Sequence, residues 1–282
     1  MASAADRTRR PGRTSVWLED GGKAGRPPHG TGRAARSGKA GKAGKAGGAG
    51  GAGGADQPAA GLDRDRITAA AVRLLDAAGP EAFSMRRLAA SLDVTAMSVY
   101  WYVDTKDELL ELALDAVFGE MRLPDTGAPD ADWREQLRAM AVTYRETLVR
   151  HPWVSPLIGR FLNIGPHSLA FARGVHEIVV RTGVPPEGHA GAIAAVFQFV
   201  YGFGTIEGHY RARSQSAGLT PDEFFQRSLE SLEHHPDGEQ TFELGRQIMA
   251  ARGADTVDEM FERDFAFALR VLVAGIEAMR DG

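Results

Sequence analysis

The sequence contains no cysteine among its 282 residues. Disulfides, thiolate metal sites and a cysteine nucleophile are therefore excluded. No run of 18 or more apolar residues occurs, so no membrane-spanning helix is expected. The first residues show no apolar core of a secretory signal. These absences favour a cytoplasmic protein that has no membrane partner.

Alternating apolar and polar residues, the pattern of a half-buried strand, are also lacking. From Asp63 onward, apolar residues recur instead at helical spacing, and the sequence predicts an all-α protein. The composition is 43% hydrophobic and 25% charged, which is ordinary for a globular protein. The roughly 220 residues that follow the first 62 are enough for one large or two small packed units.

Motifs of catalysis are missing as well. The histidines form no HExxH pair and no Ser/His/Asp set with a nucleophile elbow, and no glycine-rich loop follows a strand. His234 and His235 stand in a polar stretch typical of a solvated loop. An enzyme remains the first alternative class, but we expect no catalytic residues, no metal site and no cofactor.

Residues 1–62 differ in composition from the rest of the chain. Glycine recurs at every third position from 38 to 53, which predicts a flexible, disordered arm rather than collagen, because proline-rich triplets are missing. The arm carries eleven Lys and Arg residues against four acids, a net charge of +7, and −11 is left for the remainder. A basic arm on an acidic body indicates a polyanionic partner, although a merely solubilising leader fits equally well.

Residues 63–122 predict a small helical domain. A first helix with Ile67, Ala71 and Leu75 on one face closes at Gly79-Pro80. Ser84 and Thr95 are expected N-caps of two short helices, which are separated by the break Leu92-Asp93-Val94. Two helices around such a turn form a helix-turn-helix, whose second helix lies in the DNA major groove.

The stretch YWY at 100–102 supports this interpretation. Three consecutive residues of a helix sweep about 200° of its surface, so a single core cannot bury all three. Val99 and Val103, spaced i and i+4, are the expected inward pair. We therefore expect aromatics on a nucleic-acid face, the alternative being a hydrophobic cluster closed by the same rings.

The segments LDRDRITAAAVRLLDAAG and SMRRLAASLDVTAMSVYWYVDTKDELLELALD resemble the DNA-binding domain of the tetracycline-repressor (TetR) family. The resemblance implies a ligand-responsive transcriptional regulator, a repressor that binds a palindromic operator as a homodimer and is released by a small molecule. A DNA-binding activator or an architectural protein without an effector is the alternative. The residues that it implies at the DNA are Arg86, Thr95, Ala96, Met97, Ser98, Tyr100, Trp101, Tyr102 and Lys106.

Two positions depart from the family pattern. Asp93 stands where the family usually has glycine, and aspartate tolerates the left-handed conformation better than most residues. Ala96 and Met97 lack hydrogen-bonding groups, so base reading would combine apolar contacts to thymine methyls with Ser98 and Arg86.

Residues 63–122 hold only seven Lys and Arg against eleven acids, few for an affinity driven by phosphates. We therefore hypothesise that Arg7 to Arg13, or Lys39, Lys42 and Lys45, add a largely non-specific electrostatic attraction to DNA. Deletion of residues 1–60 would then flatten the salt dependence of affinity.

Residues 123–282 predict a larger helical domain, with helices near 131–150, 153–163, 166–182, 187–213, 221–234, 239–252 and 256–280. Thr220 to Glu223 and Thr256 to Glu259 are capping boxes. Helices 187–213 and 256–280 are the expected dimer interface, the first through small residues such as Gly191 and Gly204, the second through a stripe that includes Phe265, Leu269 and Ile276. An intramolecular core is the alternative.

The family resemblance also implies an effector site in this domain. The candidates are polar or aromatic residues within apolar helical runs: Tyr144, Trp153, Phe161, Asn163, His176, Gln198, Phe199, Tyr201, Phe203 and Glu207. For each of them taken singly, an ordinary core or surface position is the more common alternative.

Overall fold

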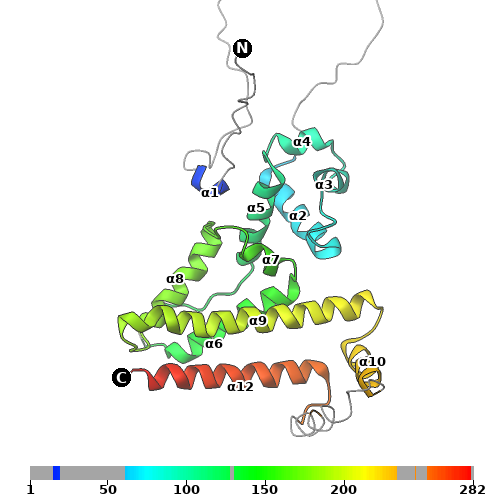
Figure 1. The fold of residues 1–282 in the computed structure, drawn as a ribbon. Helices are drawn as coiled ribbons and strands as arrows, with labels where there is room; N and C mark the ends of the chain where they lie inside the picture. Colours follow the sequence, from blue (N-terminus) through cyan, green and yellow to red (C-terminus); the bar gives the residue numbers. More distant parts are fainter. Residues whose placement is uncertain (1–14, 20–60, 128–129, 234–244, 246–252, 281–282) are drawn as a thin grey trace, which may run out of the picture. The chain divides into compact units, whose positions relative to one another are not determined.

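The structure is a computed structural model, and it describes residues 15–19, 61–127, 130–233, 245 and 253–280. Within these ranges every regular element is a helix (Figure 1), which confirms the all-α prediction. The contacts divide the chain into two units between Ala113 and Leu114, inside one helix. The sequence prediction placed the domain boundary after residue 122.

The N-terminal unit contains α1 (Val16–Glu19), α2 (Arg64–Ala78), α3 (Met85–Ser91) and α4 (Ala96–Tyr100), followed by α5 (Lys106–Phe118), which crosses the division. Its core includes Ile67, Leu75, Leu88, Val99 and Leu109. Residues 1–14 and 20–60 of the predicted arm lie outside the described residues. Ser15–Glu19 do not fit a disordered arm, because Ser15 and Val16 are buried.

Local capping explains where the helices of this unit begin. Asp63, Ser84 and Thr95 are the N-caps of α2, α3 and α4, and each side chain accepts a hydrogen bond from the backbone N–H three residues later. Thr105 accepts the N–H of Glu108 in the same way at the start of α5. The Glu108 carboxylate reaches back to the N–H of Asp104, one residue before the cap.

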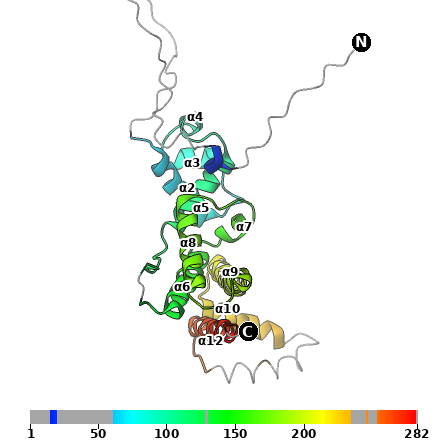
Figure 2. The same ribbon diagram turned by 90° about the vertical axis from the view of Figure 1, so that its left-hand side faces the viewer.

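The C-terminal unit contains α6 (Trp133–Arg150), α7 (Val154–Ile158), α8 (Pro166–Val180), the 3-10 turn η1 (Pro186–Gly188), α9 (His189–Ser216), α10 (Pro221–Glu233) and α12 (Val257–Ala278). The long helix α9 packs against α6, α8, α10 and α12. It runs antiparallel to α12 (Figure 1), and Figure 2 shows both helices nearly end-on. A Cβ atom at Gly208 would lie 2.8 Å from the carbonyl oxygen of Leu148, so glycine permits the close approach of α9 to α6.

One helix prediction for this unit differs from the structure, and another cannot be compared with it. The helix expected over 153–163 ends at Ile158, because Asn163 has a φ of 50° and its side-chain amide donates to the carbonyls of Ile158 and Phe161. The helix expected over 239–252 lies outside the described residues, apart from Gly245.

Among the described residues, one segment, Pro186–Ser216, is long and apolar enough to cross a membrane by length and composition alone. It consists of η1 and α9, which lie within the helical bundle of the C-terminal unit. Glu207 of α9 is buried and paired with Arg145 and Arg211, and ionisable residues of this kind are rare on the lipid-facing side of a membrane helix.

Candidate nucleic-acid interface and effector site

The turn between α3 and α4 is a Schellman motif. The N–H of Val94 donates to the carbonyl of Ala89 at 3.0 Å, and the N–H of Asp93 donates to that of Ala90 at 3.2 Å. Asp93 takes a φ of 56°, in the left-handed region. Asp93 therefore adopts the left-handed conformation that the sequence analysis expected aspartate to tolerate. This conformation produces the sharp change of direction that a helix-turn-helix needs.

Val99 and Val103 are both buried in the N-terminal unit, whereas Tyr100 and Trp101 are 43% and 38% exposed. The prediction that the valines point inward and the aromatics outward is therefore confirmed for these four residues. Tyr102 is half-buried. The helix is shorter than predicted: α4 ends at Tyr100, and Trp101 and Tyr102 lie in the turn that follows it.

The first turn of α4 presents one large apolar side chain, Met97, which is 59% exposed. Ala96 and Ser98 are half-buried on either side of it. The hydroxyls of Thr95 and Ser98 lie 2.9 Å apart and share one hydrogen bond, and Thr95 also accepts the N–H of Ser98. The outward surface of this turn is therefore mainly apolar, with two paired hydroxyls at its edge.

The basic residues near α4 differ in how they are held. Arg86 is exposed on α3, and within the described residues its guanidinium has no partner. Lys106 is half-buried at the start of α5, where its ammonium donates to the carbonyl of Phe83 at 2.8 Å and lies 5.4 Å from the centre of the Phe83 ring. Lys106 thus ties α5 to the residue that precedes the cap of α3, a structural role that the sequence did not indicate.

Four aromatic rings from four helices gather in the C-terminal unit. Phe171 of α8 lies 5.3 Å from Tyr144 of α6, 5.6 Å from Phe197 of α9 and 5.8 Å from Phe118 of α5, measured between ring centres. The contacts to Phe118 and Phe197 are edge-to-face, a favourable arrangement for aromatic pairs. Burial raises the pKa of the Tyr144 hydroxyl, so this phenol stays neutral at physiological pH.

A second cluster links α6, α9 and α12 through charged groups. Arg145 donates to Glu207 and to Glu262, each at 2.7 Å, and Arg211 donates to the other carboxylate oxygen of Glu207 at 2.8 Å. The guanidinium of Arg145 also lies 4.6 Å from the centre of the Phe265 ring. Burial by itself lowers the pKa of Arg145, but the hydrogen bonds to both glutamates outweigh it and raise the pKa.

Comparison with protein families decides the identity. The family model "Tetracyclin repressor-like, C-terminal domain" matches residues 123–280, and "Bacterial regulatory proteins, tetR family" matches residues 67–113. The chain belongs to the TetR family. It is a DNA-binding transcriptional regulator, as the resemblance of its N-terminal domain implied.

Individual relatives agree with this assignment. A transcriptional regulator of the helix-turn-helix type from Saccharopolyspora erythraea is 39% identical over 155 residues, which cover 55% of this chain and 65% of that protein. The transcriptional repressor DrrR1 of Streptomyces coeruleorubidus is 34% identical over 227 residues, which cover 79% and 80% of the two chains. The solved structure of ActR from Streptomyces coelicolor in complex with actinorhodin has a TM-score of 0.61 and 26% identity, and the match covers 78% of this chain and 97% of that one.

The predicted effector residues of this TetR-family chain do not form one group. Tyr144 joins the four-ring aromatic cluster, and Tyr201 donates to the carbonyl of Ser155. The others are dispersed. Phe199, Phe203 and Glu207 belong to the charged α6–α9–α12 cluster, and Trp153 lies edge-to-face with His151. Phe161 lies beside Arg160, the Asn163 amide donates to the carbonyl of Ile158 at the end of α7, and His176 and Gln198 are exposed.

Three members of the aromatic cluster, Phe118, Phe171 and Phe197, were missed in the sequence. Each stands in an apolar helical run, where a phenylalanine is expected to be an ordinary core residue. Only the packing of four helices brings the rings together. Among the described residues, no group of three His, Asp or Glu side chains could hold a metal ion.

Proposed function

We propose that the chain is a transcriptional repressor that reads a pseudo-palindromic operator as a homodimer and is released by an aromatic small molecule. The observation that carries the proposal is the outward surface at α4. Its helix is anchored by the buried Val99 and Val103 and leaves Met97 and Tyr100 exposed. A recognition helix must pack against its own domain on one face and expose the other face of its first turn to the DNA.

In this proposal the residues at and around α4 contact different parts of the DNA. Met97 and Ala96 contact thymine methyl groups in the major groove, while Ser98 and Arg86 supply the polar contacts to base edges or phosphates. Thr95, Tyr100, Trp101 and Tyr102 hold the phosphate backbone. Lys106 also reaches a phosphate, and its bond to the Phe83 carbonyl fixes the direction of its ammonium.

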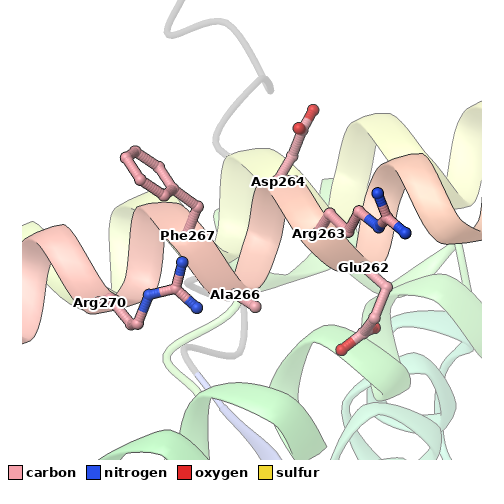
Figure 3. A pocket seen from close by; sticks show the side chains of 6 residues that line it. All are labelled: Glu262, Arg263, Asp264, Ala266, Phe267 and Arg270. Carbon is pink, nitrogen blue, oxygen red and sulfur yellow. The ribbon is translucent and has the colours of Figure 1, made fainter. Parts of the chain in front are cut away.

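The dimer forms through α9 and α12. Phe265, Leu269 and Ile276, the stripe expected to face a second subunit, are buried within the single chain, so the intramolecular alternative holds for them. The opposite face of α12 exposes Phe267 and Val271, one turn apart. A surface hollow of about 420 Å³ lies beside Phe267, with the guanidinium of Arg270 5.5 Å from the ring centre (Figure 3). Exposed apolar side chains with a charged rim fit a second copy of the chain.

The effector binds at the four-ring cluster around Phe171. Phe171 and Phe197 are only half-buried, so their faces can take a further planar ring. The Tyr144 hydroxyl has no hydrogen-bond partner among the described residues and stays neutral, which makes it a donor for a carbonyl or phenol of the effector. The structure of ActR in complex with actinorhodin supports a small-molecule effector for this chain as well.

The test is selection of DNA from a random duplex pool with the full-length protein. We expect an inverted repeat whose halves are about 34–36 Å apart, one helical turn. The variants Met97→Ala and Tyr100→Ala keep the buried valines and should lose the site, whereas Glu81→Ala, exposed and remote from α4 in sequence, should keep it. Failure to enrich any site, or equal binding by all variants, would refute the proposal.

An effector screen against the selected site separates the alternatives. Release of the protein by planar aromatic compounds, abolished in Tyr144→Phe or Phe171→Ala, supports a released repressor. Binding that no compound changes would favour the architectural protein or activator. Since its relatives are transcriptional regulators, we further propose that the chain has no enzymatic activity and acts in the cytoplasm.

A further inference from the structure

The segment Ser15–Glu19, far from the first domain helix in sequence, is docked on α5. The Glu111 carboxylate accepts the Ser15 hydroxyl at 2.7 Å and the backbone N–H of Val16 at 3.0 Å. Ser15 in turn accepts the N–H of Trp17 at 3.3 Å. Ser15 and Val16 are both 1% exposed, and all of these residues belong to the N-terminal unit.

Glu111 is a buried carboxylate in an otherwise apolar stretch of α5, between Leu110 and Leu112. Burial of a carboxylate is unfavourable unless donors surround it. In the part of the chain that the structure describes, both donors of Glu111 come from the docked segment. Glu111 therefore serves as the receptor of this segment, and no other function of the carboxylate is apparent from its contacts.

We propose that Ser15–Glu19 is a docking segment that anchors the arginine-rich start of the chain to the DNA-binding domain. Arg13 precedes Ser15 by two residues and Arg7 by eight, and eight residues span at most about 29 Å of extended chain. Glu111 follows Lys106 by five residues, about 7.5 Å along the helix axis. Four arginines therefore precede the docked segment within eight residues of sequence, and the segment itself is held on the helix that begins at Lys106.

This anchoring distinguishes the two basic clusters. Lys39, Lys42 and Lys45 stand near the middle of the 41 residues between Glu19 and Gly61, far in sequence from both described ends. The effective concentration of a tethered group at its binding site is higher when the tether between them is shorter. Arg7, Arg9, Arg10 and Arg13 are therefore the residues that add phosphate contacts. This part of the inference rests on the proposed DNA binding, whereas the docking itself does not.

Docking is tested without DNA, by hydrogen exchange of the Val16 amide in the full-length protein. We expect slow exchange in the wild type and exchange at the rate of an open chain in Glu111→Ala. Ser15→Ala, which leaves α5 intact, should accelerate it as well, and the exposed Glu81→Ala should not. Equal protection in wild type and both docking variants would overturn the proposal.

The consequence for DNA is tested on the selected operator over a range of salt concentrations. Replacement of the four arginines by alanine should reduce the slope of log affinity against log salt by about 0.9 for each arginine that contacts a phosphate. Replacement of the three lysines should leave the slope unchanged. The opposite pattern would overturn the anchoring of the arginines.

Glu111→Ala separates anchoring from charge. The substitution removes a negative charge, which by itself would raise DNA affinity. We expect the affinity to fall several-fold instead, and not to fall further when the four arginines are also replaced. Unchanged or raised affinity would overturn the anchoring even if the docking is real. A protein that binds no operator at all would instead refute the proposed function and leave the exchange result standing.

Discussion

Asp115, on α5, caps α8 through Ser168: its Oδ1 accepts the backbone N–H of Ser168 at 2.9 Å, while Oδ2 accepts that of His167 at 3.3 Å. The carboxylate is buried and satisfies two of the free donors at the start of α8. Both residues lie in the C-terminal unit, and α5 continues from there to Lys106 in the N-terminal unit. The cap therefore joins the start of α8 to the part of α5 that belongs to the C-terminal unit.

This contact makes Gly165 intolerant of a side chain. A Cβ atom there would overlap Cγ and Oδ1 of Asp115. We expect Gly165→Ala to lower the free energy of unfolding by about 1–3 kcal/mol, the usual range for overpacking. Urea denaturation measures the loss. Gly159→Ala is the matched control, since a Cβ atom at Gly159 meets nothing within 4 Å. Equal stability of both variants would mean that the Asp115 side chain can move away from the added methyl group without destabilising the protein.

The buried ion pair predicts a contrast between two glutamates that bind the same arginine. The side chain of Glu207 is 2% exposed and that of Glu262 is 68% exposed. Glu207→Ala leaves the buried Arg145 without its inner partner and should cost about 3–5 kcal/mol of unfolding free energy. Glu262→Ala should cost about 1 kcal/mol or less, because solvent replaces an exposed carboxylate. The denaturant midpoints of the two variants, compared at equal m-values, test which substitution costs more stability. Similar midpoints would contradict the prediction.

Asp93 holds a backbone conformation that glycine adopts without cost. Its φ of 56° is unfavourable for a residue with a Cβ atom, although less so for aspartate than for most. We expect Asp93→Gly to change stability by no more than about 1 kcal/mol, in the stabilising direction, and Asp93→Val to cost about 1–2 kcal/mol. Thermal unfolding of the two variants gives the answer. A valine that is tolerated as well as glycine would show that the turn can change its conformation.

The cap of α10 predicts a dependence of stability on pH. The backbone N–H and then the hydroxyl of Thr220 donate to the Glu223 carboxylate, and these bonds hold the pKa of Glu223 below its ordinary value of 4.5. A depressed pKa in the folded state stabilises the protein above the unfolded value, and this contribution is lost as the pH falls through the folded pKa.

Glu223→Gln should therefore be less stable than the wild type at neutral pH, and the difference should shrink in acid. Urea midpoints at both conditions measure it. The exposed Glu146→Gln on α6 is the control and should show no such convergence. A difference between Glu223→Gln and wild type that stays constant with pH would contradict the assignment of the cap.

Local features of the chain were readable from sequence because their causes lie within a few residues. Thr220 and Glu223 form the predicted reciprocal capping box, with Pro221 as the first helical residue. Val99 and Val103 are buried, as their i and i+4 spacing predicted. Asp93 adopts the left-handed backbone conformation in the turn. The family resemblance rested on this same region, and the two family models match residues 67–113 and 123–280.

Long-range partners could not be predicted in the same way. Lys106 meets Phe83, 23 residues earlier, and Ser15 meets Glu111 across 96 residues, although nothing in either local pattern indicates a partner. The four-ring cluster and the network around Arg145 likewise need several helices to be placed side by side.

By itself, the sequence determined the helices, their caps, the helix-turn-helix and its family, because hydrophobic period and capping act over one or two turns. Only the tertiary structure decided which face of α12 is left exposed, which aromatics gather and where the segment before the first domain docks. Those outcomes depend on how each helix buries its apolar face against others distant in the chain, and that choice is made by the packing of the whole unit.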